Sequence, residues 1–191
     1  MSLRELNIFV ISGPSGAGKS SISRKLLNQV PRLKKMITCT TREKKANEIN
    51  DVNYHFLSKD DFASHITNNE FIEYSKVYNE FYGSLQEDFD KLTKISSNIL
   101  FVIDVKGAIQ IKEKFPFAKL IFISPPSNEV LHERLSKNEN IDEDEISSRL
   151  NLVKLEMSYV NSFDYVVQND DFEKTLTKVK SLILASIDKS N

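Results

Sequence analysis

Residues 11–23 read ISGPSGAGKSSIS, and GPSGAGKS within them, Gly13–Ser20, matches the phosphate-binding pattern G-x-x-x-x-G-K-[ST]. The apolar run LNIFVIS before it predicts a strand, and apolar residues at helical spacing after Lys19 predict a helix. A strand, a glycine loop and a helix in that order form the context in which this pattern binds phosphate. The stretch therefore predicts an α/β fold that binds a nucleoside triphosphate.

The side chains of this phosphate loop (residues 13–20) suit that chemistry. Three of the five glycines in the chain fall in it, and glycine lets backbone N–H groups approach phosphate oxygens closely. Lys19 can reach between the β- and γ-phosphates, and the Ser20 hydroxyl can bind Mg²⁺. We expect ATP to contact Gly13, Pro14, Ser15, Gly16, Ala17, Gly18, Lys19, Ser20 and Ser21, with Mg²⁺ as cofactor.

The composition limits the classes of function. A length of 191 residues suits one domain, and a formal net charge of -1 gives no general attraction to nucleic acid. The first 13 residues lack a long apolar run, and no run of about 18 apolar residues occurs, so we expect neither a signal peptide nor membrane association. Cys39 is the only cysteine, which fits a reducing, cytoplasmic compartment. The histidines His55, His65 and His132 lack the spacing of metal ligands.

Further apolar runs predict the rest of a parallel sheet. Strands are expected at Met36–Thr41, Asn98–Asp104, Ala118–Ser124 and Phe163–Gln168, with helices between the later ones. Buried strands that alternate with helices predict a three-layer α/β fold, in which helices cover both faces of the sheet.

Residues 38–84 have a different pattern, because their expected strands are short and half polar. Strands are expected at Tyr54–Leu57 and Phe71–Tyr78, and the sequence SKDD from Ser58 predicts the cap of a short helix. The sequence SLQE from Ser84 reads as a second capping box before a helix that ends near Ile95. The pattern indicates a small lobe inserted into the core.

An intact phosphate loop leaves three classes open: a small-molecule kinase, a GTPase switch or an ATPase module. The chain lacks the N-K-x-D motif by which a GTPase reads its base. A larger ATPase would usually exceed one domain of this size. A kinase requires a second site with cations for the acceptor and a lid that excludes water.

Five further motifs bear on this choice: TCTTREKK (38–45), VNYHF (52–56), FIEYSKVYNEFYGS (71–84), IDVKG (103–107) and QNDD (168–171). In order and spacing, with the phosphate loop, they resemble guanylate kinase over about residues 6–187. The resemblance implies ATP-dependent phosphorylation of GMP and dGMP by one P-loop domain, residues 1–191. It also implies a core (1–37, 85–126 and 160–191), a GMP-binding lobe (about 38–84) and a helical lid (about 127–159).

The resemblance assigns the acceptor phosphate to Arg42, Lys45, Tyr54 and Tyr82. Physical chemistry agrees, because the arginine fork pairs two phosphate oxygens and phenols donate to the same group. The family has a second arginine where this chain has Lys45, which keeps the charge but loses the bidentate geometry.

Guanine presents N1–H and an exocyclic amine as donors, and a carboxylate can accept from both. The resemblance places Glu73 at the base-reading position, Asp104 as its partner, and Ser84 and Thr38 at hydroxyl positions near O6. The alternative for Glu73 is an ordinary solvent-facing carboxylate on an alternating strand, and Ser84 can also cap a helix.

In the lid, Arg134 and Arg149 match arginines that clamp the transferring phosphoryl group, although both could be surface helix residues. Asn169 matches a contact to adenine. The chain departs from the family at Val102, where an aspartate is usual, and at Asn138, within a usual Gly-Arg-Gly.

Two alternatives to a guanylate kinase stay open: a non-catalytic binding module of the same fold, and another P-loop kinase acting on a different small molecule. The oligomeric state stays open as well.

Overall fold

The computed structural model describes residues 6–127, 129–131 and 152–188. Its larger sheet is fully parallel, with the strand order β2-β7-β1-β8-β9. In that order the strands are Leu33–Lys35, Asn98–Val102, Asn7–Ser12, Lys119–Ser124 and Tyr165–Gln168. The strands β1, β7 and β8 consist of apolar runs with buried side chains on both faces, as expected for a covered parallel sheet.

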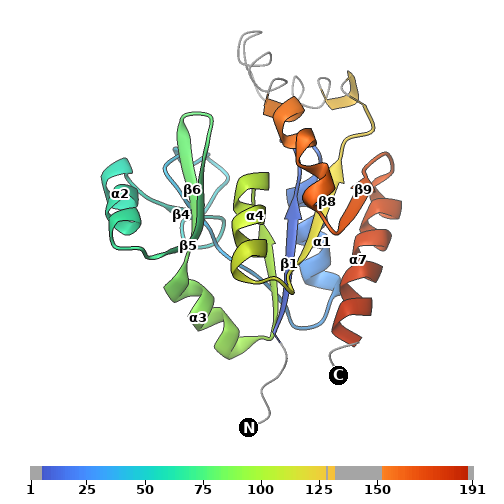
Figure 1. Ribbon diagram of the computed structural model, residues 1–191, viewed down its shortest axis with the longest axis horizontal. Helices are drawn as coiled ribbons and strands as arrows, with labels where there is room; N and C mark the ends of the chain where they lie inside the picture. Colours follow the sequence, from blue (N-terminus) through green and yellow to red (C-terminus); the bar gives the residue numbers. More distant parts are fainter. Residues whose placement is uncertain (1–5, 128, 132–151, 189–191) are drawn as a thin grey trace.

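Helices cover both faces of this sheet (Figure 1). Phe9 and Ile11 of β1 pack with α1 (Lys19–Gln29) and α7 (Phe172–Asp188). The alternate residues Ile8 and Val10 pack on the other face with α3 (Gln86–Ile95) and α4 (Val105–Lys114). The predicted parallel α/β fold is confirmed, and its core lies in two layers on either side of the sheet.

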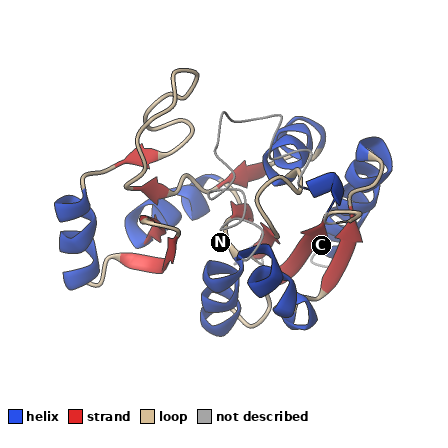
Figure 2. Ribbon diagram, turned by 90° about the horizontal axis from the view of Figure 1, so that it is seen from above, coloured by secondary structure: helices blue, strands red, loops and turns tan. Residues whose placement is uncertain are grey.

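A second sheet stands beside the first, with the order β4-β3-β6-β5 (Figure 2). These strands are His55–Phe56, Cys39–Thr40, Glu80–Leu85 and Phe71–Val77. The helix α2 (Lys59–Thr67) packs on this sheet through Phe62, whose ring stacks on Phe71 at 4.5 Å between centroids. We call this sheet with α2 the small lobe; the chain enters it after β2 and leaves it at α3.

The strand predicted at Met36–Thr41 is wrong in its bounds. The core strand β2 lies earlier and is mostly polar, because it is an edge strand that pairs only with β7 among the described strands. The apolar residues that follow cross between the two sheets: Met36 packs in the core, and Cys39 begins β3 in the small lobe. A buried crossing has the same apolar pattern as a buried strand.

Of the two predicted helix caps, one is confirmed and one is wrong. The Ser58 hydroxyl accepts a hydrogen bond from the Asp61 N–H at 3.0 Å and caps α2. Ser84 does not cap α3, because β6 continues to Leu85, which is the N-cap residue and gives no side-chain cap.

Most of the expected lid, including Arg134, Asn138 and Arg149, lies outside the described residues. Residues 152–158 are helical and lead to a 3₁₀ turn, η1 (Val160–Ser162). None of the described helices is both long enough and apolar enough to cross a membrane.

Candidate active site

The phosphate loop holds its three glycines, Gly13, Gly16 and Gly18, at positive φ, where other residues are strained. Gly13 has a φ of 132° and Gly18 a φ of 98°, in the left-handed region. A Cβ atom at Gly13 would also lie 2.2 Å from the Ile123 carbonyl oxygen of β8. The loop therefore fits closely over the carboxyl ends of β1 and β8, where open α/β sheets bind their ligands.

Lys19 lies within this loop, where its ammonium donates to the carbonyl oxygens of Gly13 and Pro14. Burial lowers the pKa of Lys19, while the nearby carboxylates of Glu156 and Asp104 oppose this shift. Among the described residues no side chain caps the N-terminus of α1, and its first turn holds no acidic residue. The positive end of the helix is thus directed at the loop, as phosphate binding requires.

Asn169 follows β9 and lies against the phosphate loop. Its amide nitrogen donates to the Ala17 carbonyl at 2.7 Å, and a Cβ atom at Gly18 would lie 2.4 Å from that nitrogen. Asn169 therefore packs against the phosphate loop and stabilises its conformation. Its expected contact with adenine stays a prediction.

A cleft of about 680 Å³ connects the phosphate loop with the small lobe. From the loop and α1 it is lined by Ser15, Gly16, Gly18, Lys19, Ser20 and Ser21. Opposite lie the predicted acceptor residues Thr38, Arg42, Lys45, Tyr54 and Tyr82. Val102, Ile103 and Asp104, at the end of β7, form part of the wall between them.

The cations and phenols expected at the acceptor phosphate lie together. The Arg42 guanidinium carbon is 5.6 Å from the centre of the Tyr54 ring, and the rings of Tyr54 and Tyr82 meet edge to face at 6.2 Å. Burial raises the pKa of Tyr54, so its phenol stays a hydrogen-bond donor at neutral pH. The group can bind a phosphate dianion by charge and by O–H donation.

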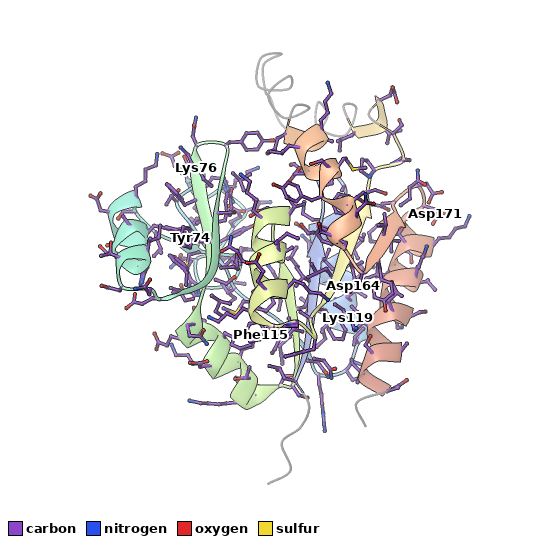
Figure 3. All side chains as sticks on the ribbon, viewed as in Figure 1. Tyr74, Lys76, Phe115, Lys119, Asp164 and Asp171 are labelled. Carbon is purple, nitrogen blue, oxygen red and sulfur yellow. The ribbon has the colours of Figure 1, made fainter. Side chains whose placement is uncertain are left out.

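Two of the residues expected to serve the base, Glu73 and Ser84, also lie together, but deeper. Glu73 is 2% exposed, and its Oε1 accepts a hydrogen bond of 2.6 Å from the Ser84 hydroxyl. Along β5, Glu73 and Ser75 are buried while Tyr74 and Lys76 point outward (Figure 3). The solvent-facing alternative for Glu73 is therefore wrong. Neither Glu73 nor Ser84 is among the described residues that line the cleft.

Burial raises the pKa of Glu73 to about 8, although the Ser84 hydroxyl acts in the opposite direction. The free protein thus holds this carboxyl largely neutral at pH 7. A ligand with two adjacent N–H donors would stabilise the ionised form instead.

Asp104 has a structural task besides its place in the cleft. Its Oδ1 accepts from the N–H groups of Lys106 at 2.9 Å and Gly107 at 3.2 Å, which caps α4. Its Oδ2 accepts from the Ser75 hydroxyl of β5. Asp104 therefore ties the core to the small lobe, beside the position where Val102 replaces the usual aspartate.

Ser75, Glu156 and Glu48 are among the residues of the site that were not predicted from the sequence. Ser75 could have been found, because it shares the inward face of β5 with Glu73. Glu156 lines the cleft with Leu152, four residues earlier on the same helix. The i, i+4 spacing places both side chains on one helix face, which could have marked Glu156 as a neighbour of Leu152. Glu48 lies in an aperiodic polar loop, where no pattern marks it.

Glu156 adds a buried carboxyl group near the loop. It is 6% exposed, and burial raises its pKa to about 7, with Lys19 acting in the opposite direction. Within the described part of the chain, no three His, Cys, Asp or Glu side chains are arranged to hold a metal ion. Ser20, with carboxylates nearby to orient water, fits the sparse protein ligation that Mg²⁺ takes beside phosphates.

A phosphate-binding loop that faces an acceptor pocket across one cleft defines a P-loop small-molecule kinase. Comparisons narrow the class, since a sequence model described as guanylate kinase matches residues 5–186. A guanylate kinase of Caldanaerobacter subterraneus subsp. tengcongensis is 39% identical over 97% of this chain and 90% of its own length. One of Rickettsia felis is 38% identical over 96% of this chain and 95% of its own.

Solved structures agree. The crystal structure of guanylate kinase from Anaplasma phagocytophilum superposes with a TM-score of 0.79 and 28% identity, covering 96% of this chain and 87% of that one. A shikimate kinase from Bacteroides thetaiotaomicron shares the fold alone, with a TM-score of 0.54 and 11% identity over 93% of this chain and 98% of its own. The chain belongs to the guanylate kinase family.

Proposed function

We propose that this protein transfers the γ-phosphoryl group of ATP to GMP and dGMP, which yields ADP with GDP or dGDP. The observation that carries this function most directly is the buried Glu73–Ser84 pair of the small lobe, whose residues Arg42, Tyr54 and Tyr82 share one cleft with an intact phosphate loop. A carboxylate with a hydroxyl partner matches the Watson–Crick edge of guanine, whereas adenine would set its N1, an acceptor, against the carboxylate.

The residues have separate tasks in this proposal. The loop N–H groups and Lys19 hold the ATP phosphates, while Arg42, Lys45, Tyr54 and Tyr82 hold the acceptor phosphate. Glu73, Ser84, Thr38 and Asp104 serve the base. An oxygen of the acceptor phosphate attacks the γ-phosphorus as its bond to the ADP oxygen breaks, and no covalent enzyme intermediate forms.

Charge stabilisation is the main catalytic contribution. Lys19 and Arg42, with Arg134 and Arg149 from the proposed lid (about 127–159), neutralise the charge that spreads over the transferring oxygens. Mg²⁺, held through Ser20 and the phosphates, would neutralise charge between the β- and γ-phosphates. In this division the core is formed by 1–37, 85–126 and 160–191, and the GMP-binding lobe by 38–84.

A coupled assay of ADP formation with GMP, dGMP, AMP and UMP tests the proposal. We expect turnover of GMP and dGMP and at most traces with the others. Turnover of AMP or UMP without GMP would favour another P-loop kinase. Tight GMP binding without phosphoryl transfer would favour a non-catalytic binding module.

A cytoplasmic location is also proposed. Its support is the single cysteine, Cys39, which is buried in the small lobe. Burial raises the pKa of this thiol to about 12, so it stays unreactive in a reducing compartment.

A further inference from the structure

Glu48 links the Arg42 side chain to the backbone of Lys45, the second basic residue of the acceptor-phosphate pocket. Its Oε1 and Oε2 lie 2.7 and 3.0 Å from Nη2 of Arg42. Its Oε2 also accepts from the Lys45 backbone N–H at 2.8 Å, and the Glu48 N–H donates to the Lys45 carbonyl at 3.0 Å. One carboxylate therefore holds the Arg42 side chain and closes the turn that carries Lys45.

This bridge limits the freedom of a long side chain. Arg42 is packed over the rings of Tyr54 and Phe56, at 5.6 and 5.7 Å, and its Nη1 donates to the Glu43 carbonyl at 2.6 Å. A free arginine has large rotamer entropy, which phosphate binding would otherwise have to remove. Fixing the guanidinium in advance lowers that cost.

The ion pair between Glu48 and Arg42 favours the charged form of both side chains. Burial by itself raises the pKa of the Glu48 carboxyl, but its bonds with Arg42 and Lys45 hold that pKa below the ordinary value. Glu48 is thus ionised at neutral pH, in a wall of the cleft where a phosphate dianion is expected.

A carboxylate at this place can either compete with the phosphate for Arg42 or position Arg42 for it. The geometry favours positioning, because both carboxylate oxygens converge on Nη2, at one end of the fork. The guanidinium has five N–H donors, of which Glu48 occupies those of Nη2 and the Glu43 carbonyl one of Nη1. Of the other two, one serves the side-chain hydrogen bond with Tyr82, which leaves one donor for a phosphate oxygen.

We propose that Glu48 is a positioning residue that holds Arg42 and the Lys45 turn in the geometry that binds the acceptor phosphate. The proposal rests on the proposed function, since it concerns the phosphate of the same acceptor nucleotide. It predicts an effect on the phosphate of GMP and none on the base.

The test compares GMP with guanosine, which has the base but no phosphate. We expect Glu48→Gln to raise the calorimetric Kd for GMP at least tenfold and to leave the Kd for guanosine within about twofold. In the coupled assay, KM for GMP should rise more than kcat falls. The matched control is Glu43→Gln, because Glu43 is an exposed neighbour whose backbone, not its carboxylate, contacts Arg42.

A double-mutant cycle supplies the second test. In an Arg42→Met background, Glu48→Gln should cause little further loss of GMP affinity, because the group that it positions is gone. Equal or tighter GMP binding by Glu48→Gln alone would overturn the proposal in favour of competition. Equal losses for GMP and guanosine would overturn it in favour of a general effect on the lobe. Failure of the wild-type protein to phosphorylate GMP would instead reject the proposed function.

Discussion

The Glu73 carboxyl is buried against the Ser84 hydroxyl, and the start of α4 leaves just enough room for it. A Cβ atom at Gly107 would lie 2.3 Å from Oε2 of Glu73. The same helix start is capped by Asp104, which also accepts from Ser75. The proposed recognition of the base therefore depends on a few closely packed contacts around Glu73.

The raised pKa of Glu73 predicts a pH dependence of base binding. In the folded protein without ligand, the pKa of Glu73 is about 8, above the ordinary 4.5. The neutral carboxyl therefore predominates below pH 8. Guanine donors need the ionised form, so guanosine affinity should increase from pH 6.5 to 8, by up to about tenfold per unit. Calorimetry with guanosine avoids titration of the phosphate. A flat profile, or an equal slope in Glu73→Gln, would contradict this.

Gly107→Ala should displace Glu73 and lower kcat/KM for GMP at least tenfold, because the new methyl group meets the carboxylate. Alanine favours a helix by about 1 kcal/mol over glycine, so stability should not fall in proportion. Steady-state kinetics and urea unfolding measure the two effects. The control, Ala108→Gly, should destabilise α4 and leave KM for GMP unchanged; a wild-type KM in Gly107→Ala would refute the steric argument.

The sequence predicts the buried strands well, but not the edge strand β2 or the N-terminus of α3. Strands β7 and β8 were predicted because both faces are buried and the whole run is apolar. The edge strand β2 was missed, because a polar LKK segment shows no such pattern. The SLQE sequence at Ser84 fits a capping box, but β6 keeps this residue for the hydrogen bond with Glu73. At Ser84, therefore, the buried hydrogen bond with Glu73 forms in place of the helix cap that the local sequence favours.

The cap of α2 can be tested by itself. Ser58 is exposed and is not among the described residues that line the cleft. Its hydroxyl accepts a hydrogen bond from the Asp61 N–H and donates one to the Asp61 carboxylate at 2.6 Å. Ser58→Ala should lower the free energy of unfolding by about 1 kcal/mol without changing turnover. Ser64→Ala, within the same helix, should be neutral or slightly stabilising. Equal effects of the two substitutions in urea unfolding would contradict the cap.

The molecule as a whole has two separate sheets (Figure 2), and the proposed donor and acceptor sites belong to different ones. The phosphate loop follows β1 of the parallel sheet, and Arg42, Glu73 and Tyr82 belong to the small lobe. The sequence motifs predicted both halves, because each has a pattern tied to its chemistry. They could not predict the bridge from Arg42 to Glu48 or the place of Glu156, because these depend on how loops and helices meet in space.

Recognition of guanine by Glu73 is the central claim, and the ratio of kcat/KM for GMP to that for inosine monophosphate tests it most directly. Inosine monophosphate keeps N1–H but lacks the exocyclic amine, so the carboxylate loses one of two charge-assisted bonds. The ratio should be roughly 10 to 100 in the wild-type protein, and should fall to within about threefold of unity in Glu73→Gln. Equal use of both nucleotides by the wild type, or an unchanged ratio in Glu73→Gln, would contradict the claim.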